Sequence, residues 1–194
     1  MDMPFDAMGE TSDEALLVLF ANGDGAAARV LTQRLTPRVM AHAYRLLGHH
    51  AEAEDVTQEA MLRLWKQAAN WRQGEARVST WLYRVVANLC IDRRRRARGV
   101  ALESIPEPED DTASAAEVLQ DRARAAALQS ALDALPDRQR QAVVLRHLDG
   151  LANPEIAEIM EITVEAVESL TSRGKRALAA ALGARQEELG YADD

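Results

Sequence analysis

The feature that most constrains this chain is a break in composition at residues 99–121, which separates two stretches of helical pattern. The segment holds seven acidic residues and no lysine or arginine, and it contains Pro106 and Pro108. A run of like charge with prolines and no apolar periodicity is expected to be extended and mobile. The sequence therefore predicts two small domains, over residues 10–98 and 122–186, joined by a flexible acidic linker over 99–121.

Helical periodicity dominates both predicted domains. Of the 194 residues, 47% are hydrophobic and only 4% are aromatic, and the helix formers alanine and leucine are abundant. Glu52–Ala69 gives the clearest pattern, because Val56, Leu64 and other apolar residues recur at intervals of four on one stripe. No stretch alternates as a strand would, so we expect an all-α fold. The Thr36–Pro37 pair either kinks a long helix or starts a new one, with the threonine as its N-cap.

Composition also excludes several classes of function. No apolar run approaches the length of a membrane span and the N-terminus lacks the basic start of a signal peptide, so we expect no membrane insertion. The single cysteine, Cys90, cannot form an internal disulfide and fits a reducing cytoplasm. We expect no catalytic centre, metal or cofactor, because the chain has no nucleophile elbow or glycine-rich phosphate loop and its histidines lack metal-ligand spacing. The histidines are His42, His49, His50 and His147.

The stretch Trp71–Arg98 combines aromatic and basic residues. A polar loop precedes a helix that carries Trp81 and ends in the run Arg93–Arg96. Aromatic rings stack on unpaired bases, which contributes roughly 1–3 kcal/mol per base, and arginines bind phosphates. The pattern indicates single-stranded nucleic acid. Two plainer interpretations stay open, because Trp81 follows an apolar helical spacing typical of a core and arginines also favour the C-terminal end of a helix.

Residues Asn153–Leu182 have the pattern of a helix-turn-helix. Asn153 before Pro154 predicts an N-cap, and Glu161–Thr163 predicts a tight turn whose threonine caps a second helix. The residues that would pack the two helices are Ile156, Ala157, Ile159, Ile162, Val167, Leu170 and Leu178. The second helix of such a motif enters the major groove with its N-terminal residues toward the base edges. The alternative is an ordinary antiparallel helix pair.

The net charge of −8 limits how tightly the isolated chain can bind DNA. Phosphate contacts supply most of the non-specific affinity of a protein for DNA, and an acidic chain makes few of them. Although the acid is most concentrated in residues 99–121, tight DNA binding by the isolated chain is not expected. A larger basic partner would have to supply the rest of the contacts.

Three blocks of the sequence resemble the extracytoplasmic-function group of sigma-70 factors. The block AEAEDVTQEAMLRLWKQA, at Ala51–Ala68, resembles the conserved helix of their second region, and STWLYRVVANLCIDRRRR, at Ser79–Arg96, resembles the segment that comes after that helix in the family. Ala134–Leu178 resembles their fourth region. The resemblance covers about residues 13–182 in the family's order. It implies a bacterial initiation subunit that binds RNA polymerase core and directs it to promoters.

The resemblance also assigns roles to residues of this sequence. The helix Glu52–Ala69 would dock on the clamp helices of the largest polymerase subunit, and the second-largest subunit would be a further contact. The polymerase-binding residues would be Asp55, Gln58, Glu59 and Arg63. The loop Asn70–Thr80 would capture a flipped base of the −10 strand, and would have to offset a few kcal/mol of unstacking. The −10 contacts would be Asn70, Arg72, Arg77, Ser79, Thr80, Trp81, Arg84, Asn88, Arg93, Arg94, Arg95 and Arg96.

Recognition of the −35 element would fall to the second helix of the helix-turn-helix. The candidate residues are Glu165, Glu168, Ser169, Ser172, Arg173, Lys175 and Arg176. This helix departs from the family, because many members carry a basic residue where Glu168 stands. A glutamate repels phosphates but accepts hydrogen bonds from cytosine amino groups. The −35 sequence of better-known members therefore does not transfer to this chain.

An anti-sigma factor is the remaining partner that the resemblance implies. Members of the family are commonly held inactive by one, and a flexible linker would let the two domains clamp around it. The acidic linker would thread toward the RNA exit path of the polymerase as an RNA mimic, with a plain tether as the alternative. The competing function is a free-standing helix-turn-helix transcriptional regulator, which would dimerise and bind an operator without polymerase.

Overall fold

Every secondary-structure element that the structure describes is a helix. The computed structural model describes residues 9–72, 74, 77–99 and 117–183. These residues contain no strand, and none of their helices combines the length and the hydropathy that crossing a membrane requires. The expected all-α fold is confirmed for this part of the chain.

The described residues of the N-terminal part form four α-helices. They are α1 (Asp13–Ala21), α2 (Gly25–Leu47), α3 (His50–Gln67) and α4 (Val78–Gly99), with the 3-10 helix η2 (Ala68–Asn70) after α3. Ser12 caps α1, because its hydroxyl accepts a hydrogen bond from the N–H of Ala15 at 3.2 Å. Asp24 caps α2 in the same way, accepting from the N–H of Ala26 at 2.8 Å. Each cap satisfies a backbone donor that the helix itself leaves unpaired.

Helix α2 is continuous and includes Pro37. Of the two alternatives for Thr36–Pro37, the long helix is therefore correct and the new start is wrong. The helix ends at Gly48, whose φ of 73° is a conformation that favours glycine. A side chain there would also lack room, because an added Cβ would lie 2.8 Å from Oδ2 of Asp133 in the C-terminal part.

The apolar stripe predicted on α3 lies in the middle of the core. Val56 and Leu64 are fully buried, together with Leu31 of α2, and Leu82 of α4 is almost so. Burying an aliphatic side chain of this size contributes about 1.5–3 kcal/mol. The stripe is confirmed, and it fixes the rotation of α3 so that Asp55 and its neighbours face outward.

The described C-terminal part of the chain consists of four α-helices and one π-helical turn. They are α5 (Glu117–Asp133), α6 (Asp137–Val143), the π-helical turn η3 (Val144–Leu148), α7 (Asn153–Met160) and α8 (Val164–Gly183). Helices α7 and α8 form the predicted helix-turn-helix, with Ile156, Ile159 and Val167 buried. Helix α8 packs closely on α6 at Gly174, where an added Cβ would collide with Val143.

Several helix boundaries differ from the predictions: α3 spans His50–Gln67 in place of the predicted Glu52–Ala69, and α4 extends to Gly99, the first residue assigned to the linker. The linker was expected to reach Asp121, but α5 already begins at Glu117, since an alanine-rich sequence with acids in its first turns favours a helix. The rest of the linker, residues 100–116, lies outside the described residues. Helix α7 has Ala152 as its N-cap, so the N-cap predicted at Asn153 is wrong by one residue. Glu155 compensates from within the helix, accepting from the N–H of Ala152 at 3.0 Å.

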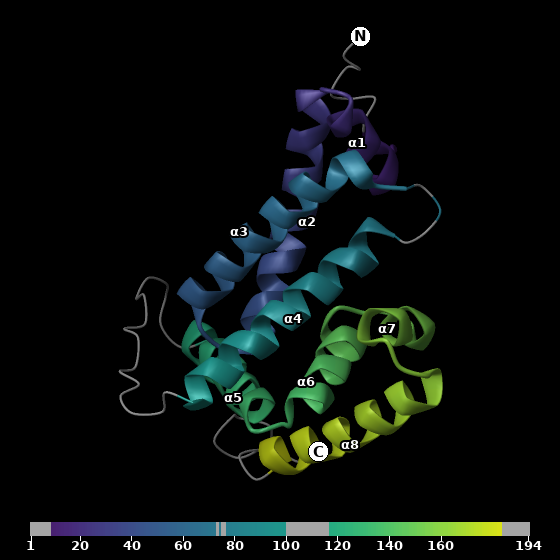
Figure 1. Cartoon of the computed structure of the whole chain (residues 1–194). Coiled ribbons are helices and arrows are strands. Elements are labelled where there is room, and N and C mark those ends of the chain that lie inside the picture. The colour runs from purple at the N-terminus through teal and green to yellow at the C-terminus, as the bar shows by residue number, and fades with distance from the viewer. Residues whose placement is uncertain (1–8, 73, 75–76, 100–116, 184–194) are drawn as a thin grey trace.

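The two parts of the chain pack against each other, since α7 lies beside α4 and α5 packs on α2, while α8 lies on the far side of α6 (Figure 1). One apolar cluster extends from α1–α4 into the C-terminal part, where it includes Leu132 of α5, Leu135 of the turn after it, Val143 of α6 and Val144 of η3. The domain boundaries at residues 98 and 122 remain a prediction. The apolar core, however, is shared between the two parts.

Arg140 of α6 is the largest polar side chain in this shared core, at 1% exposure. Its guanidinium donates to the carbonyl oxygens of Leu132, Asp133 and Leu135 at 2.5–3.0 Å, which are the last carbonyls of α5 and its turn. It also donates to the carbonyl of Leu46 in α2 at 3.2 Å. One buried cation therefore satisfies helix ends from both parts of the chain.

Candidate nucleic-acid interface

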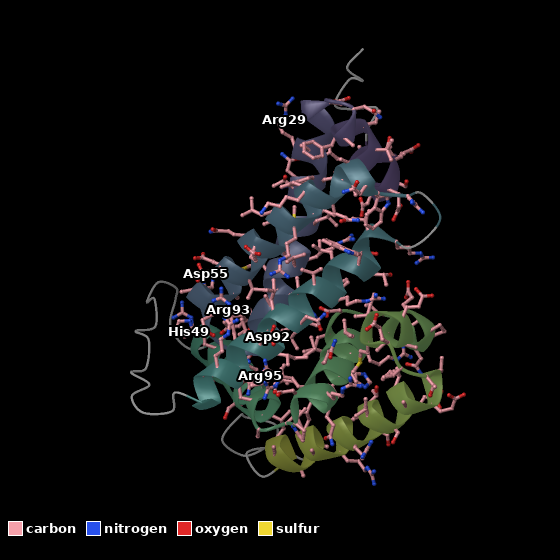
Figure 2. The ribbon with its side chains drawn as sticks, in the orientation of Figure 1. Arg29, His49, Asp55, Asp92, Arg93 and Arg95 are labelled. Atoms are coloured by element: carbon pink, nitrogen blue, oxygen red, sulfur yellow. The ribbon has the colours of Figure 1, made fainter. Side chains whose placement is uncertain are left out.

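An open groove between α3 and α4 gathers the residues predicted to bind polymerase. Its lining from α3 is Asp55, Gln58, Glu59, Leu62 and Arg63, and from α4 it is Leu89, Asp92, Arg93 and Arg96. Across it, Nη1 of Arg93 lies 3.3 Å from Oδ2 of Asp55, and Figure 2 shows these two side chains close together. Within α3, Nε of Arg63 lies 2.8 Å from Oε1 of Glu59. Leu62 is 53% exposed, so the groove combines charge with an uncovered apolar side chain.

The four arginines predicted as one phosphate-binding run point in different directions. Successive residues turn by about 100° around a helix, so four in a row cannot share a face. Arg93 and Arg96 line the α3–α4 groove, whereas Arg95 is exposed. Arg94 turns toward the C-terminal part, and its Nη1 lies 3.1 Å from Oδ1 of Asp133. In this arrangement the run forms no single patch, and the role of each arginine in −10 binding stays a prediction.

The loop before α4 is fixed at both ends. Trp71 lies edge-on to Trp81 with ring centroids 6.2 Å apart, and the N–H of Val78 donates to Oε1 of Glu14 at 2.9 Å. Among the predicted −10 contacts here, the exposed residues are Asn70, Arg72, Arg77 and Asn88, and the partly buried ones are Ser79, Trp81 and Arg84. Thr80 is only 4% exposed, so it is not accessible to DNA in this conformation. Trp81 packs on the core with part of its surface still accessible, which leaves both of its predicted roles open.

Two of the predicted −10 contacts, Arg77 directly before α4 and Arg84 within it, are engaged by the helix-turn-helix. Nη1 of Arg77 lies 2.7 Å from Oε1 of Glu155, and Nη1 of Arg84 lies 2.9 Å from Oε1 of Glu161. Nη2 of Arg84 also donates to the carbonyl oxygen of Glu158 at 2.8 Å. These contacts join residues 74 to 78 positions apart, and no sequence spacing indicates them.

A buried polar cluster that the sequence analysis missed joins α2 to the turn before α7. The Asp149 side chain is 3% exposed, accepts from Nη1 of Arg45 at 2.5 Å and lies 2.6 Å from Nδ1 of His42. The ring of Tyr83 from α4 packs edge-on against His42, with centroids 4.8 Å apart. Burial, with the nearby charge of Asp149, raises the pKa of the Tyr83 hydroxyl. Asp149 and His42 are 107 residues apart, so only the tertiary structure reveals the cluster.

The residues predicted to recognise the −35 element all lie at exposed positions of α8. They are Glu165, Glu168, Ser169, Ser172, Arg173, Lys175 and Arg176. The predicted cap at Thr163 is confirmed, because its hydroxyl accepts from the N–H of Ala166 at 3.2 Å. Hydrogen bonds from its own backbone N–H and from the Thr163 hydroxyl lower the pKa of Glu165. Oε1 of Glu168 accepts from Nδ2 of Asn153 at 3.5 Å, so α7 helps to orient that carboxylate.

The described part of the chain contains neither a candidate metal site nor an exposed cysteine. Its His, Cys, Asp and Glu residues nowhere gather in a group of three that could hold a metal ion. Cys90 is buried, and this burial raises the pKa of its thiol to about 12, so it stays protonated and unreactive at neutral pH.

Two family models match the chain in the order of its two parts. They are sigma-70 region 2, over residues 31–100, and sigma-70 region 4, over residues 125–178. The ECF RNA polymerase sigma factor SigE of Mycolicibacterium smegmatis is 34% identical over 178 residues, which cover 87% of this chain and 68% of SigE. SigM of Mycobacterium tuberculosis is 34% identical over 183 residues, which cover 92% of this chain and 89% of SigM.

The chain belongs to the extracytoplasmic-function group of the sigma-70 family. This sigma factor is thus an alternative transcription initiation factor with the two domains through which such factors bind RNA polymerase and promoter DNA, as the sequence blocks implied. Sigma factors initiate transcription and are not enzymes.

Solved structures of sigma factors share its fold. CnrH in complex with the cytosolic domain of CnrY matches with a TM-score of 0.69 at 24% identity, over 89% of this chain and 97% of CnrH. RpoE in complex with the anti-sigma factor NepR from Bartonella quintana matches with a TM-score of 0.63 at 23% identity, over 80% of this chain and 96% of RpoE. At these identities the likeness supports the fold alone.

Proposed function

We propose that this sigma factor binds bacterial RNA polymerase core through the α3–α4 groove and directs it to promoters. The loop Asn70–Thr80 and α4 bind the opened −10 strand, and α8 recognises the −35 element. The observation that carries the proposal is the groove itself, which brings together all four residues predicted to bind polymerase. The clamp helices of the largest subunit are the expected partner, and the second-largest subunit is a further contact.

The chemistry of the groove suits a basic helical partner. Its ion pairs are exposed, with side chains 31–66% accessible, and such pairs stabilise a protein by at most about 1 kcal/mol. Arginines of a docking partner can therefore replace Arg93 and Arg63 beside Asp55 and Glu59 at little cost. The exposed Leu62 supplies apolar area that such a partner would bury.

The test is capture of core RNA polymerase by the full chain. D55K/E59K should lose capture, because both substitutions place cations against a basic surface. The control E54K/D121K makes the same change in net charge at two exposed residues outside the groove and should be captured like the wild type. Normal capture of D55K/E59K would contradict the assignment. Failure of the wild type to bind core at all would favour the free-standing regulator.

We also infer that this sigma factor works in the cytoplasm, where the polymerase and the chromosome lie, and that it has no catalytic activity of its own. The family match supports both inferences, because sigma factors act by binding.

Control by an anti-sigma factor is the regulatory part of the proposal. The sigma factor RpoE, which shares this fold, was solved in complex with the anti-sigma factor NepR. We expect affinity capture of this chain from unstressed cells of its host to yield a bound protein other than polymerase subunits. Capture of polymerase subunits alone, under both unstressed and stressed conditions, would contradict this expectation.

A further inference from the structure

We propose that Arg146, His147 and Lys175 form a phosphate-binding site at the edge of the −35 reading surface, and that His147 takes up a proton when a DNA phosphate enters the site. Binding to −35 DNA therefore strengthens as the pH falls. The ligand is a backbone phosphate of the duplex, a group that positions a protein without reading the base sequence. This inference rests on the proposed function of α8 and adds pH dependence to it.

His147 and Lys175 come from two helical segments that pack closely. Helix α8 approaches α6 at Gly174, where an added Cβ would collide with Val143. Lys175 directly follows this glycine, and His147 of η3 comes about one helical turn after Val143. Figure 1 shows α6 lying against α8. The imidazole and the ammonium group therefore belong to one junction between the two segments, and both side chains are exposed there.

Arg146 supplies the third cation of the site from the same turn as His147. Its Nη1 donates to the carbonyl oxygen of Leu151 at 2.9 Å, directly before the N-cap of α7. The guanidinium thus lies at the N-terminal end of α7, where the helix dipole also favours an anion. The first helix of a docked helix-turn-helix crosses the DNA backbone, so we expect phosphates at this end of α7.

Lys175 lies on the side of α8 that faces the start of α7. Residues seven positions apart differ by about 20° around a helix, so Lys175 and Glu168 share one edge of α8. Glu168 accepts from Nδ2 of Asn153, the first residue of α7, at 3.5 Å. Arg146 and Lys175 therefore approach the N-terminal end of α7 from two segments, with His147 beside both.

The positive charge of this site is not neutralised within the described part of the chain. Neither His147 nor Lys175 has a hydrogen bond or ion pair there, and the charged groups that act on the imidazole are the cations Lys175 and Arg146. Carboxylates on the neighbouring elements have other partners. They are Asp137, Asp149, Glu155 and Glu168. Three cations without a counter-charge suit a phosphate.

The charge state of His147 depends on whether the phosphate is present. Partial burial of the ring, and then the charges of Lys175 and Arg146, lower the pKa of His147 from its ordinary value of 6.5. The imidazole is therefore neutral at pH 7 in the free protein. A phosphate beside it favours the imidazolium, because an opposite charge stabilises the charged form.

The sign of the pH effect follows from this difference. The pKa of His147 is higher in the DNA complex than in the free protein, so binding takes up a proton. Affinity is greatest below the pKa of the free protein, falls as the pH rises between the two pKa values, and is constant above the pKa of the complex. A difference of one pKa unit corresponds to a tenfold change in Kd.

The test uses holoenzyme reconstituted from the full chain and core polymerase. The probe is a duplex selected by wild-type holoenzyme from a randomised −35 library, and Kd is measured by fluorescence anisotropy at pH 6.0 and 8.0. H147Q replaces the imidazole with a neutral side chain, and H147R replaces it with a permanent cation. H50Q changes an exposed histidine of α3 outside the groove and serves as the control.

We expect wild type and H50Q to bind about tenfold more tightly at pH 6.0 than at pH 8.0, relative to the change that H147Q shows. H147R should bind more tightly than wild type at pH 8.0 and change with pH only as H147Q does. Its salt dependence should also be steeper than that of H147Q by a slope of about 1, as one added phosphate contact requires.

Equal pH dependence in wild type and H147Q, with equal salt slopes for H147Q and H147R, would overturn the inference. In that outcome a selected −35 motif would leave the proposed function standing. Failure of wild-type holoenzyme to form, or to select any −35 sequence, would contradict the proposed function and this inference with it. Circular dichroism of the free chains checks that the substitutions at this exposed position leave the fold intact.

Discussion

At the scale of single residues, Arg140 should contribute more to stability than any exposed arginine. R140M keeps the apolar stem but leaves the carbonyls of Leu132, Asp133, Leu135 and Leu46 without their donor. A buried acceptor without a partner costs about 1–3 kcal/mol, so we expect the free energy of unfolding in urea to fall by about 3 kcal/mol or more. R138M, at an exposed position of the same helix, should change it by less than about 0.5 kcal/mol. Equal values for the two variants would mean that water replaces the guanidinium.

Glu168 is the residue on which −35 specificity can be tested most directly. Its carboxylate is exposed on α8 and oriented by Asn153. E168A should change the preferred base at one −35 position, which we expect to be a cytosine-containing pair, with a discrimination of about 1–3 kcal/mol. The measurement is selection from a randomised −35 library by holoenzyme, with E158A as a charge-matched control. An unchanged motif with uniformly tighter binding would show that Glu168 only repels phosphates.

At the scale of helices, the packing of α8 on α6 depends on the absence of a side chain at Gly174. G174A raises helix propensity by about 1 kcal/mol, yet its methyl group would collide with Val143. Overpacking a well-filled contact costs about 1–3 kcal/mol, so we expect a lower Tm by circular dichroism. G183A, at the end of the same helix, meets nothing within 4 Å and should leave Tm unchanged or raise it. A higher Tm for G174A would show that α8 shifts at no cost.

The sequence predicted which segments form helices better than it predicted the residues at which those helices begin and end. The stripe of Val56 and Leu64 determines α3, and the Thr163 cap determines where α8 starts, because both are local patterns. The N-cap of α7 moved from Asn153 to Ala152 because Glu155 supplies the cap from inside the helix. The run Arg93–Arg96 shows that adjacent residues in the sequence need not form one binding site. The rotation of the helix directs Arg93 and Arg96 into the α3–α4 groove and Arg94 toward Asp133.

At the scale of the whole molecule, the arrangement of the two parts lay beyond prediction from sequence. An acidic linker with prolines predicts separate domains, and nothing in the spacing of His42, Arg45 and Asp149 indicates that they meet. Their contacts bridge 104 and 107 residues, and their partners are defined only after both parts have folded. The four residues predicted to bind polymerase were easier to place together, because they follow one face of a single helix.

The shared core predicts that the two parts unfold together. All three tryptophans, Trp65, Trp71 and Trp81, lie in the N-terminal part, so their fluorescence follows that part alone, whereas far-UV circular dichroism follows both. We expect the two signals to give coincident urea transitions, since Leu132 and its neighbours belong to one apolar cluster with α1–α4.

A destabilising substitution in α5 should therefore lower the urea midpoint of the tryptophan fluorescence, although all three tryptophans lie in the N-terminal part. L132A removes a side chain that is 1% exposed and should cost about 2–5 kcal/mol, which lowers the urea midpoint of both signals by the same amount. L62A makes the same substitution at a leucine that is 53% exposed and should leave both midpoints nearly unchanged. If L132A shifted only the circular dichroism signal, the two parts would be independent folding units, and contacts across the junction would contribute little to stability.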